Sequence, residues 1–356
     1  KNNPNAAISQ KAATQGMVLL ENNNNSLPIA QTKGTKVALF GVGSYKTIKG
    51  GTGSGDVYLK DGANITVEQG FEDAGYDVVN QDFLTAQNTA YEKAESEAGS
   101  GGMFSSFVYK EEAYAEADVT AAAGKTDTAI YVLARNSGEG ADRKAEKGDY
   151  YLADVEEANI RTLAEHYEKV LLVINCGGIL DLSILDEVPG IGAVLHFVQG
   201  GEEGGNAFAD IVSGKVTPSG KLTDTWAIDY YDYPCAEEFG ILGDVLQQNY
   251  REGIYVGYRW FDANKIEPRW SFGFGLSYAD FEITVQNTQI VGTMVTVTAC
   301  VRNISSCYSG KDVVQLYLAK PEGKLHKEHK ALAAFRKTGL LAPGQEEICT
   351  LQVDLQ

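Results

Sequence analysis

The chain has few of the features that mark membrane proteins or nucleic-acid-binding proteins. Its 356 residues contain no apolar run near the ~18 residues that a membrane-spanning helix needs. Its first residues lack the basic-then-apolar pattern of a secretory signal. Lysine and arginine number 30 against 48 acidic residues, for a net charge of −18, which cannot replace the counterions around phosphate. We therefore expect no membrane and no nucleic-acid partner, and the missing signal favours a cytoplasmic location.

Metal ligands and disulfide partners are also scarce. The cysteines are odd in number, have no C-x-x-C spacing and stand at Cys176, Cys235, Cys300, Cys307 and Cys349. Of the four histidines, only His326 and His329 are close in sequence. This composition argues against a disulfide framework and a zinc site. We interpret the cysteines as mostly buried thiols in a reducing compartment and expect neither a metal nor a cofactor.

Common catalytic signatures are missing as well. The chain has no G-x-S-x-G nucleophile elbow. A dinucleotide fingerprint beginning at Gly41 would need glycine where Lys46 stands. The G-K-T at 124–126 follows Val119 where a P-loop needs its first glycine. These mismatches weaken the hypothesis of a flavodoxin-like or Rossmann-like nucleotide enzyme.

Two residue types that enzymes often use have a simpler interpretation here. Cys176 lies where an apolar run gives way to glycines, and no base for it is recognisable in the sequence. His196 lies within an apolar run that is typical of a buried strand. We predict that Cys176 is a core thiol and His196 a core histidine.

The first three quarters of the chain alternate between buried strands and helices. Short apolar runs bounded by glycine or polar residues indicate buried parallel strands. Strands that alternate with helices at this spacing predict βαβ units and a largely parallel sheet flanked by helices. The expected strands are 36–43, 76–79, 128–134, 170–175 and 191–197, and the expected helices are 8–20, 67–74, 152–166 and 207–212. Residues 1–275 are therefore predicted to form an α/β domain, with an irregular insertion at 95–115.

The pattern changes near Tyr278. Apolar and polar residues then alternate with a period of two, most clearly over 295–302. Further short strands are expected at 281–285, 313–318 and 348–353. Residues 276–356 thus predict an immunoglobulin-like all-β sandwich. Such a sandwich needs about seven strands, and since fewer can be counted we expect this domain to be incomplete.

The segment after the strand 128–134 carries the strongest candidate for acid/base chemistry. Glu139 stands between Gly138 and Gly140, with Asp142 and Arg143 just beyond. Ligands in open α/β sheets bind outside the carboxyl ends of the strands, where this glutamate is expected. Taken alone, the segment fits a catalytic carboxylate and a solvated polar turn equally well. Asp142 is too close in sequence to be a second catalytic carboxylate, so we expect it to orient Arg143 or to contact substrate.

A glycine-rich loop at 49–56 is the second candidate site. Its glycines let the backbone approach a bound molecule, and Thr52, Ser54 and Asp56 supply hydrogen-bonding groups beside Gly53. A sugar or another polar ligand, a structural turn and a phosphate site all remain open, with phosphate the least favoured. The aromatic residues between 250 and 278 can stack on sugars or form a packed seam between the two domains.

A series of motifs resembles glycoside hydrolase family 3, in particular its bacterial β-glucosidase branch. The match runs in order along nearly the whole chain, and the joint occurrence of the motifs is highly specific. The motifs are Met17–Asn22, Lys49–Asp56, Ser137–Arg143 with Lys147–Asp149, Pro218–Leu222, Ile254–Arg259 and Phe272–Tyr278. One departure is Thr223, where family members usually carry proline; it alters a turn and no chemistry.

The resemblance implies a fold and a mechanism. Residues 1–275 would be the family's α/β sandwich domain, and the β region its fibronectin type III-like domain. Similar β-glucosidases hydrolyse with retention, and the glutamate of their Ser-Gly-Glu-Gly motif, here Glu139, is the general acid/base. Ser54 and its neighbours Thr52 and Gly53 would line the sugar subsite, and we also expect Asp142 and Arg143 to bind substrate. The nucleophilic aspartate belongs to a (β/α)₈ barrel whose signature is absent from this sequence.

The leading hypothesis is therefore the acid/base-bearing part of a β-glucosidase, inactive by itself. Its expected partners are a β-glucoside or cello-oligosaccharide and the barrel domain of the same enzyme; a homo-oligomer is compatible with the sequence. The barrel can precede residue 1 or follow Gln356, and we favour the second order because residues 1–8 resemble a free start. A β-xylosidase of the same family and a non-catalytic carbohydrate-binding module are the alternatives.

Overall fold

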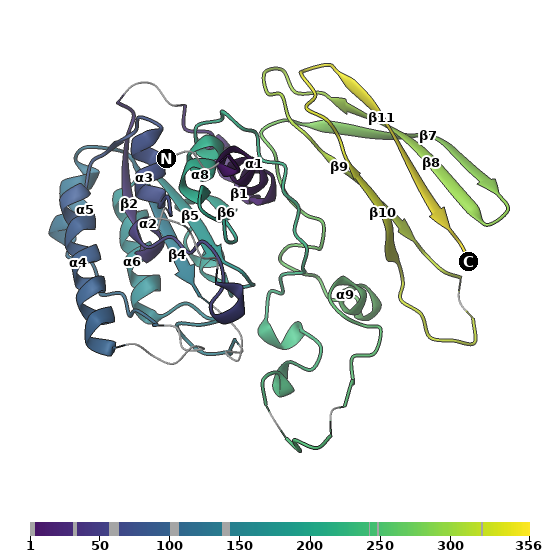
Figure 1. Cartoon of the computed structure of the whole chain (residues 1–356), viewed down its shortest axis with the longest axis horizontal. Coiled ribbons are helices and arrows are strands. Elements are labelled where there is room, and N and C mark those ends of the chain that lie inside the picture. Colours follow the sequence, from purple (N-terminus) through teal and green to yellow (C-terminus); the bar gives the residue numbers. More distant parts are fainter. Residues whose placement is uncertain are drawn as a thin grey trace. The chain divides into compact units, whose positions relative to one another are not determined.

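Figure 1 shows the computed structural model of the chain. It describes residues 4–30, 34–56, 64–99, 107–136, 143–241, 243–247, 249–321 and 323–356, apart from the side chain of Ser54. The chain divides into two compact units, Lys1–Val216 and Thr217–Gln356. The predicted boundary between family domains, after residue 275, stays a prediction.

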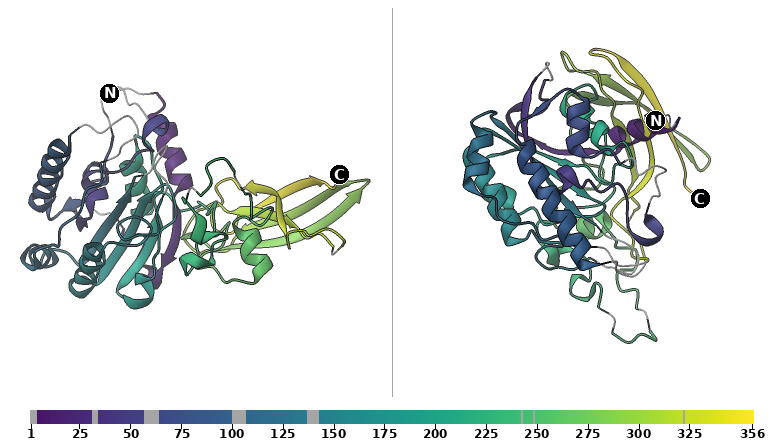
Figure 2. Two further views of the ribbon diagram at one scale, coloured as in Figure 1. Left: turned by 90° about the horizontal axis from the view of Figure 1, so that it is seen from below. Right: turned by 60° about the vertical axis from the view of Figure 1, so that its left-hand side comes forward.

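The first unit is built on one six-stranded sheet of strand order β1-β6-β5-β4-β2-β3, with helices on both of its faces (Figure 2). All neighbours in it are parallel except β1 and β6. Its strands are β1 (Val18–Asn22), β2 (Lys36–Phe40), β3 (Asp77–Val78), β4 (Thr128–Arg135), β5 (Lys169–Cys176) and β6 (Ile191–His196). Its α-helices are α1 (Ala6–Gly16), α2 (Val42–Tyr45), α3 (Val67–Asp73), α4 (Gln81–Ala98), α5 (Glu116–Ala123), α6 (Asp154–His166), α7 (Ile184–Glu187) and α8 (Gly204–Val212).

The central strands confirm the expectation drawn from the apolar runs. Every residue of β4 except Ala134 is buried, as is every residue of β5 except Lys169. A strand covered on both faces needs a continuous apolar run rather than an alternating one. The two strands pair in parallel along their whole length, so that Arg135 stands opposite Cys176 at their carboxyl ends.

The predicted helix over 8–20 is wrong in its second half. Helix α1 ends at Gly16, and the chain continues as β1, which pairs antiparallel with β6 at the edge of the sheet. The apolar residues Met17 to Leu20 are each at most 2% exposed. Four successive buried side chains cannot share one face of a helix, whereas a strand buried on both faces accommodates them.

The irregular insertion predicted at 95–115 begins too early. Helix α4 extends to Ala98 and α5 begins at Glu116, and neither helix was expected. In α4 only Leu84 is buried, so this surface helix carries almost no apolar periodicity. The described residues 107–115 lie outside regular elements.

The second unit contains a helical segment and an all-β region. Strands β8, β7 and β11 form one sheet, and β9 and β10 another, so the predicted immunoglobulin-like architecture is confirmed. Its core is made by Ala299 and Val301 of β8, Cys349 and Leu351 of β11, Val314 and Leu341. The elements are α9 (Tyr258–Asn264), β7 (Phe281–Val291), β8 (Met294–Asn303), β9 (Val313–Leu318), β10 (Ala331–Lys337) and β11 (Glu346–Asp354).

Strand β10 was not expected, because its sequence, Ala-Leu-Ala-Ala-Phe-Arg-Lys, does not alternate between apolar and polar residues. That the domain is incomplete stays a prediction.

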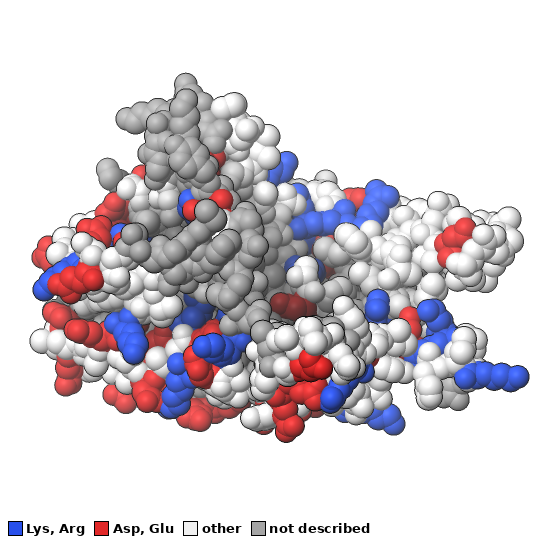
Figure 3. Space-filling model, turned by 60° about the horizontal axis from the view of Figure 1, so that its bottom comes forward, with Lys and Arg blue, Asp and Glu red and all other residues white. Residues whose placement is uncertain are grey.

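No helix in the described part of the chain is both long and apolar enough to cross a membrane. On the face shown in Figure 3, acidic and basic side chains of the described residues are interspersed. The basic side chains of the described residues visible there form no continuous surface that would suit a polyanion.

Helices α3 and α8 approach each other through glycine. A Cβ at Gly205 of α8 would lie 1.9 Å from the carbonyl oxygen of Thr66, the N-cap residue of α3. A Cβ at Gly70 would lie 2.2 Å from the carbonyl oxygen of Gly205. Since backbone atoms cannot swing away, the two helices can come this close only where both positions lack a side chain.

We expect Gly205→Ala to destabilise the first unit by about 3 kcal/mol, because the added methyl must push two helix backbones apart. The measurement is urea unfolding of the chain followed by circular dichroism. Gly16→Ala is the matched control: no heavy atom lies within 4 Å of its Cβ position, and alanine is the better helix former. Equal unfolding midpoints for the two variants would contradict the prediction.

Candidate functional site

The candidate site lies where the parallel strands of the first unit end. Strands β2, β4, β5 and β6 run in the same direction, so the segments that follow them leave the sheet at one edge. This edge is the position at which open α/β sheets bind ligands. Both predicted site segments, 49–56 and 137–143, follow strands that end there.

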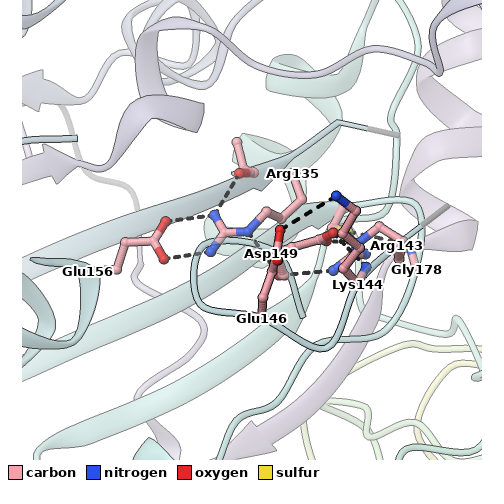
Figure 4. A network of polar contacts seen from close by, with 9 residues as sticks. Arg135, Arg143, Lys144, Glu146, Asp149, Glu156 and Gly178 are labelled. Carbon is pink, nitrogen blue, oxygen red and sulfur yellow. Dashed lines mark hydrogen bonds and ion pairs between the residues drawn. The ribbon is translucent and has the colours of Figure 1, made fainter. Parts of the chain in front are cut away.

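The last residue of β4 is fixed by a buried ion pair. The Arg135 guanidinium donates to both carboxylate oxygens of Glu156 in the first turn of α6, at 2.6 and 2.5 Å. Each side chain is 10% exposed. Figure 4 shows the two groups facing each other fork to fork, the geometry that makes such pairs strong. Burial alone would lower the pKa of Arg135, but its hydrogen bonds to Glu156 and the charge of that carboxylate outweigh burial and raise it.

The chain beyond the predicted catalytic segment is tied down by Asp149. Its carboxylate accepts hydrogen bonds from Nε of Arg143 and, at 2.7 Å, from the backbone N–H of Lys144. Its carbonyl oxygen accepts from Nη2 of Arg143 at 3.0 Å and from Nε of Arg135 at 3.1 Å. Arg143 also donates from Nη1 to Sγ of Cys176, over 3.3 Å. Figure 4 shows Asp149 between the two arginines.

A second anchor, Asn175 of β5, holds the start of the glycine-rich loop. Its side chain is fully buried. The amide oxygen accepts from the N–H of Ile48 at 2.6 Å, and the amide nitrogen donates to the carbonyls of Ile48 and Val198, each at 2.9 Å. Sequence reasoning did not single out Asn175. The available signal was a lone amide at the end of the apolar run 170–175.

The glycine-rich loop is closed on itself by short contacts. The carbonyl oxygen of Thr52 accepts from Gly55 N–H at 3.2 Å, and that of Gly53 accepts from Asp56 N–H at 3.1 Å. Gly53 has φ +64°, a left-handed conformation that favours glycine. Lys49 forms an ion pair with Asp56, 3.4 Å apart.

The structure describes only some of the predicted site residues. Thr52, Gly53 and Arg143 are described; Glu139, Asp142 and the side chain of Ser54 lie outside the described residues. The two site segments are linked through adjacent residues of β5, since Asn175 holds Ile48 and Cys176 accepts from Arg143. Arg143 donates to protein acceptors from all three of its guanidinium nitrogens, so its predicted contact with substrate stays a prediction.

A half-buried carboxyl group behind this edge was not anticipated from the sequence. Glu111 accepts hydrogen bonds from the hydroxyls of Tyr114 and of Tyr131 in β4. Tyr114 in turn accepts from the N–H of Gly41, which follows β2, at 2.9 Å. Burial raises the pKa of Glu111 to about 7, against the opposing effect of the two tyrosine hydrogen bonds. Arg135 is already paired with Glu156, so Glu111 keeps its proton well above the usual range.

The residues expected to be structural are buried. Cys176 is fully buried, as predicted for a core thiol, and it also accepts the hydrogen bond of Arg143. His196 is 5% exposed, and burial lowers its pKa to about 4, so the ring is neutral at pH 7. Of the aromatic residues between 250 and 278, Phe261, Trp270 and Tyr278 are buried, whereas Tyr250 is 88% exposed. Among the described residues, no group of histidine, cysteine and acidic side chains could hold a metal ion.

The fold is that of an α/β domain, with an open sheet edge of the kind at which such domains bind ligands, joined to an immunoglobulin-like domain. Residues 17–258 match the model of the glycosyl hydrolase family 3 C-terminal domain, and residues 312–356 match that of a fibronectin type III-like domain. The chain belongs to glycosyl hydrolase family 3. The predicted family membership is thereby confirmed.

Curated relatives share about a third of their residues with this chain. Beta-glucosidase A of Butyrivibrio fibrisolvens is 36% identical, over 98% of this chain and 46% of that protein. A beta-glucosidase of Ruminococcus albus is 37% identical, over 97% of this chain and 36% of that protein. The chain thus spans about half, or less, of the length of these relatives.

Solved structures agree with the fold over almost the whole chain. Beta-glucosidase 3B from Thermotoga neapolitana, in complex with glucose, superimposes with a TM-score of 0.87 at 34% identity. The match covers 99% of this chain and 49% of that one. A beta-glucosidase from Paenibacillus barengoltzii gives a TM-score of 0.90 at 35% identity, over 99% of this chain and 38% of that one.

The raised pKa of Glu111 leads us to expect that the free energy of unfolding depends on pH. Folded chains hold its proton up to about pH 7, whereas unfolded chains release it near the ordinary value of 4.5. The contribution of Glu111 to the free energy of unfolding is therefore full below about pH 4.5 and falls as the pH rises to about 7. The loss amounts to roughly 3 kcal/mol.

Glu111→Gln, which mimics the protonated carboxyl, should remove this pH dependence. The measurement is the free energy of unfolding at pH 4.5 and pH 8 for wild type and variant. The exposed neighbour offers a matched control in Glu112→Gln, which should keep the wild-type slope. Parallel pH profiles for wild type and Glu111→Gln would show that Glu111 does not titrate in this range.

Proposed function

We propose that this chain is the acid/base-bearing part of a β-glucosidase that hydrolyses terminal β-D-glucosides with retention. The supporting observation is its likeness, over nearly its whole length, to proteins named beta-glucosidases at 36–37% identity. The Ser-Gly-Glu-Gly motif at 137–140 supplies the acid/base residue Glu139. The described residues on either side of this segment, Arg135 and Arg143, are fixed at the edge where such sheets bind ligands.

The proposal assigns the second catalytic carboxylate to another domain. Retaining hydrolysis needs a nucleophile about 5–5.5 Å from the acid/base, on the opposite side of the scissile bond. The relatives are about twice as long as this chain or longer, which leaves room for a (β/α)₈ barrel carrying a nucleophilic aspartate. The glycine-rich loop, with Thr52, Gly53 and Ser54, would face that barrel and line the sugar subsite.

In this mechanism Glu139 protonates the leaving glycosidic oxygen and then deprotonates the incoming water. The first step requires a carboxyl that keeps its proton while the nucleophile is ionised. Closure of the barrel over the edge would desolvate Glu139, and the negative charge of the nucleophile would raise its pKa further. Both effects depend on the barrel.

The isolated 356-residue chain should therefore show no measurable hydrolysis of an aryl β-glucoside. The comparison is the complete enzyme, assayed at the same molar concentration. Turnover by the isolated chain would overturn the proposed division of the catalytic pair. Tight binding of glucose by the isolated chain in a calorimetric titration, without turnover in the complete enzyme, would instead favour a carbohydrate-binding module.

In the complete enzyme, Glu139→Gln should slow glycosylation by cellobiose roughly 10²- to 10⁴-fold, because a poor leaving group needs the proton. Activated aryl glucosides should be slowed far less in the same step, and azide should restore release of the glycosyl-enzyme. The control is Glu146→Gln, an exposed glutamate seven residues further along the chain, which should match the wild type. Wild-type rates of Glu139→Gln on cellobiose would exclude the assigned role.

A further inference from the structure

Asp149 lies next to the candidate site and has no role in the proposed mechanism. It receives hydrogen bonds from the residues on both sides of the segment that carries Glu139. Arg135, the last residue of β4, contacts its carbonyl oxygen, and Arg143 and Lys144, the first residues described after the segment, contact its carboxylate. One residue thus joins the two ends of the segment (Figure 4).

The carboxylate of Asp149 has a demand that no neutral side chain of its size meets. Its two oxygens accept from two different donors, Nε of Arg143 on Oδ1 and the N–H of Lys144 on Oδ2. A carboxylate accepts at both oxygens, whereas an amide accepts at one and donates from the other end. The ion pair with Arg143 is partly shielded from solvent, with side-chain exposures of 20% and 26%.

Asp149 and its two arginine partners are themselves held by other parts of the fold. The peptide N–H of Asp149 donates to the carbonyl of Glu146 at 3.2 Å. Arg135 stands in the central sheet beside Cys176, and Arg143 donates to the sulfur of that same cysteine. The residues at both ends of the segment are therefore held at the carboxyl ends of β4 and β5.

Chain length shows what this anchoring does. Glu139 is four residues from Arg135 and four from Arg143. An extended chain spans at most about 3.6 Å per residue, so each fixed end confines Glu139 to within roughly 14 Å. If the Asp149 carboxylate were lost, Arg143 would keep only its bonds to the Asp149 carbonyl and to Cys176, and the N–H of Lys144 would lose its acceptor, so the C-terminal end of the segment would be held more loosely. Confining a catalytic group in this way lowers the entropy that its correct placement costs.

We infer that Asp149 is a positioning residue for the general acid/base, a role that rests on the proposed function of Glu139. It acts through Arg143 and Lys144 and touches neither substrate nor reacting atoms. Its loss leaves the acid/base present but poorly placed.

The test is Asp149→Asn in the complete enzyme. This substitution keeps the side-chain volume and the two hydrogen bonds that the carbonyl oxygen of residue 149 accepts from Arg135 and Arg143. We expect kcat/KM on cellobiose to fall roughly ten- to hundred-fold. Glycosylation by an activated aryl glucoside should change less than about threefold, because that leaving group needs little protonation. A misplaced Glu139 also lies farther from the nucleophile, so the basic limb of the pH profile should move to lower pH.

Asp154→Asn provides the matched control. It is the same substitution five residues away, on a side chain that is 82% exposed and pairs with Lys147. This variant should keep the wild-type ratio of the two substrates and the wild-type pH profile. If Asp149→Asn does not fold, Arg143→Lys serves as the second variant, because lysine keeps the charge but loses the fork that spans Asp149 and Cys176.

The outcomes separate this inference from the proposed function. Equal loss on both substrates with an unmoved pH profile, or no loss at all, would overturn the positioning role and leave a structural one. If Glu139→Gln itself lacks leaving-group dependence and azide rescue, the proposed function fails. If Glu139→Gln behaves as expected and Asp149→Asn does not, only the inference about Asp149 fails.

Discussion

The ion pair between Arg135 and Glu156 is the contact on which the edge of the sheet depends. Both charges are buried, and removal of either would leave the other without a partner, at a cost of roughly 3–5 kcal/mol. The pair joins the end of β4 to the first turn of α6. Glu156 also accepts from the N–H of Ala153 at 2.8 Å, so one carboxylate orients the arginine and caps the helix. The Nε of Arg135 remains available for Asp149, and the contact thus extends to the segment beyond.

In the candidate site, the residues that hold the loops in place differ from the residues to which the proposed function assigns chemistry. Asn175, Cys176 and Arg135 lie on central strands that pair along their full length, and their polar atoms face the loops. Thr52 and Gly53, which the proposed function assigns to the sugar subsite, lie on the glycine-rich loop itself. Loops can carry function because a rigid scaffold fixes their ends. The buried polar groups of the strands therefore belong to the candidate site through the loop residues that they hold.

The sequence predicted the parts of the fold that follow from local pattern. The runs 128–134 and 170–175 became β4 and β5 because strands buried on both faces leave a continuous apolar run. Helix α4 escaped notice because it buries only Leu84, and β1 escaped because its apolar residues follow directly after α1 and were assigned to the same helix. The position of Glu139 after a buried strand and between two glycines singled it out, and the family motifs favoured a catalytic carboxylate over a solvated turn. The pairing of Arg135 with Glu156, 21 residues apart, and the enclosure of Glu111 depend on tertiary contacts that no local pattern records.

The charges along the edge bear on how an acid/base at Glu139 would gain its pKa. Arg135 is balanced by Glu156 and Arg143 by Asp149, while Glu111 avoids a third negative charge by keeping its proton up to about pH 7. The described anchors therefore bring no large net charge to the segment between them. The rise that general-acid catalysis needs must then come from loss of water and from a second carboxylate close by. In the proposed mechanism the barrel domain would supply both on closing over the edge, so that the acidity of Glu139 and the completion of the site would depend on the same event.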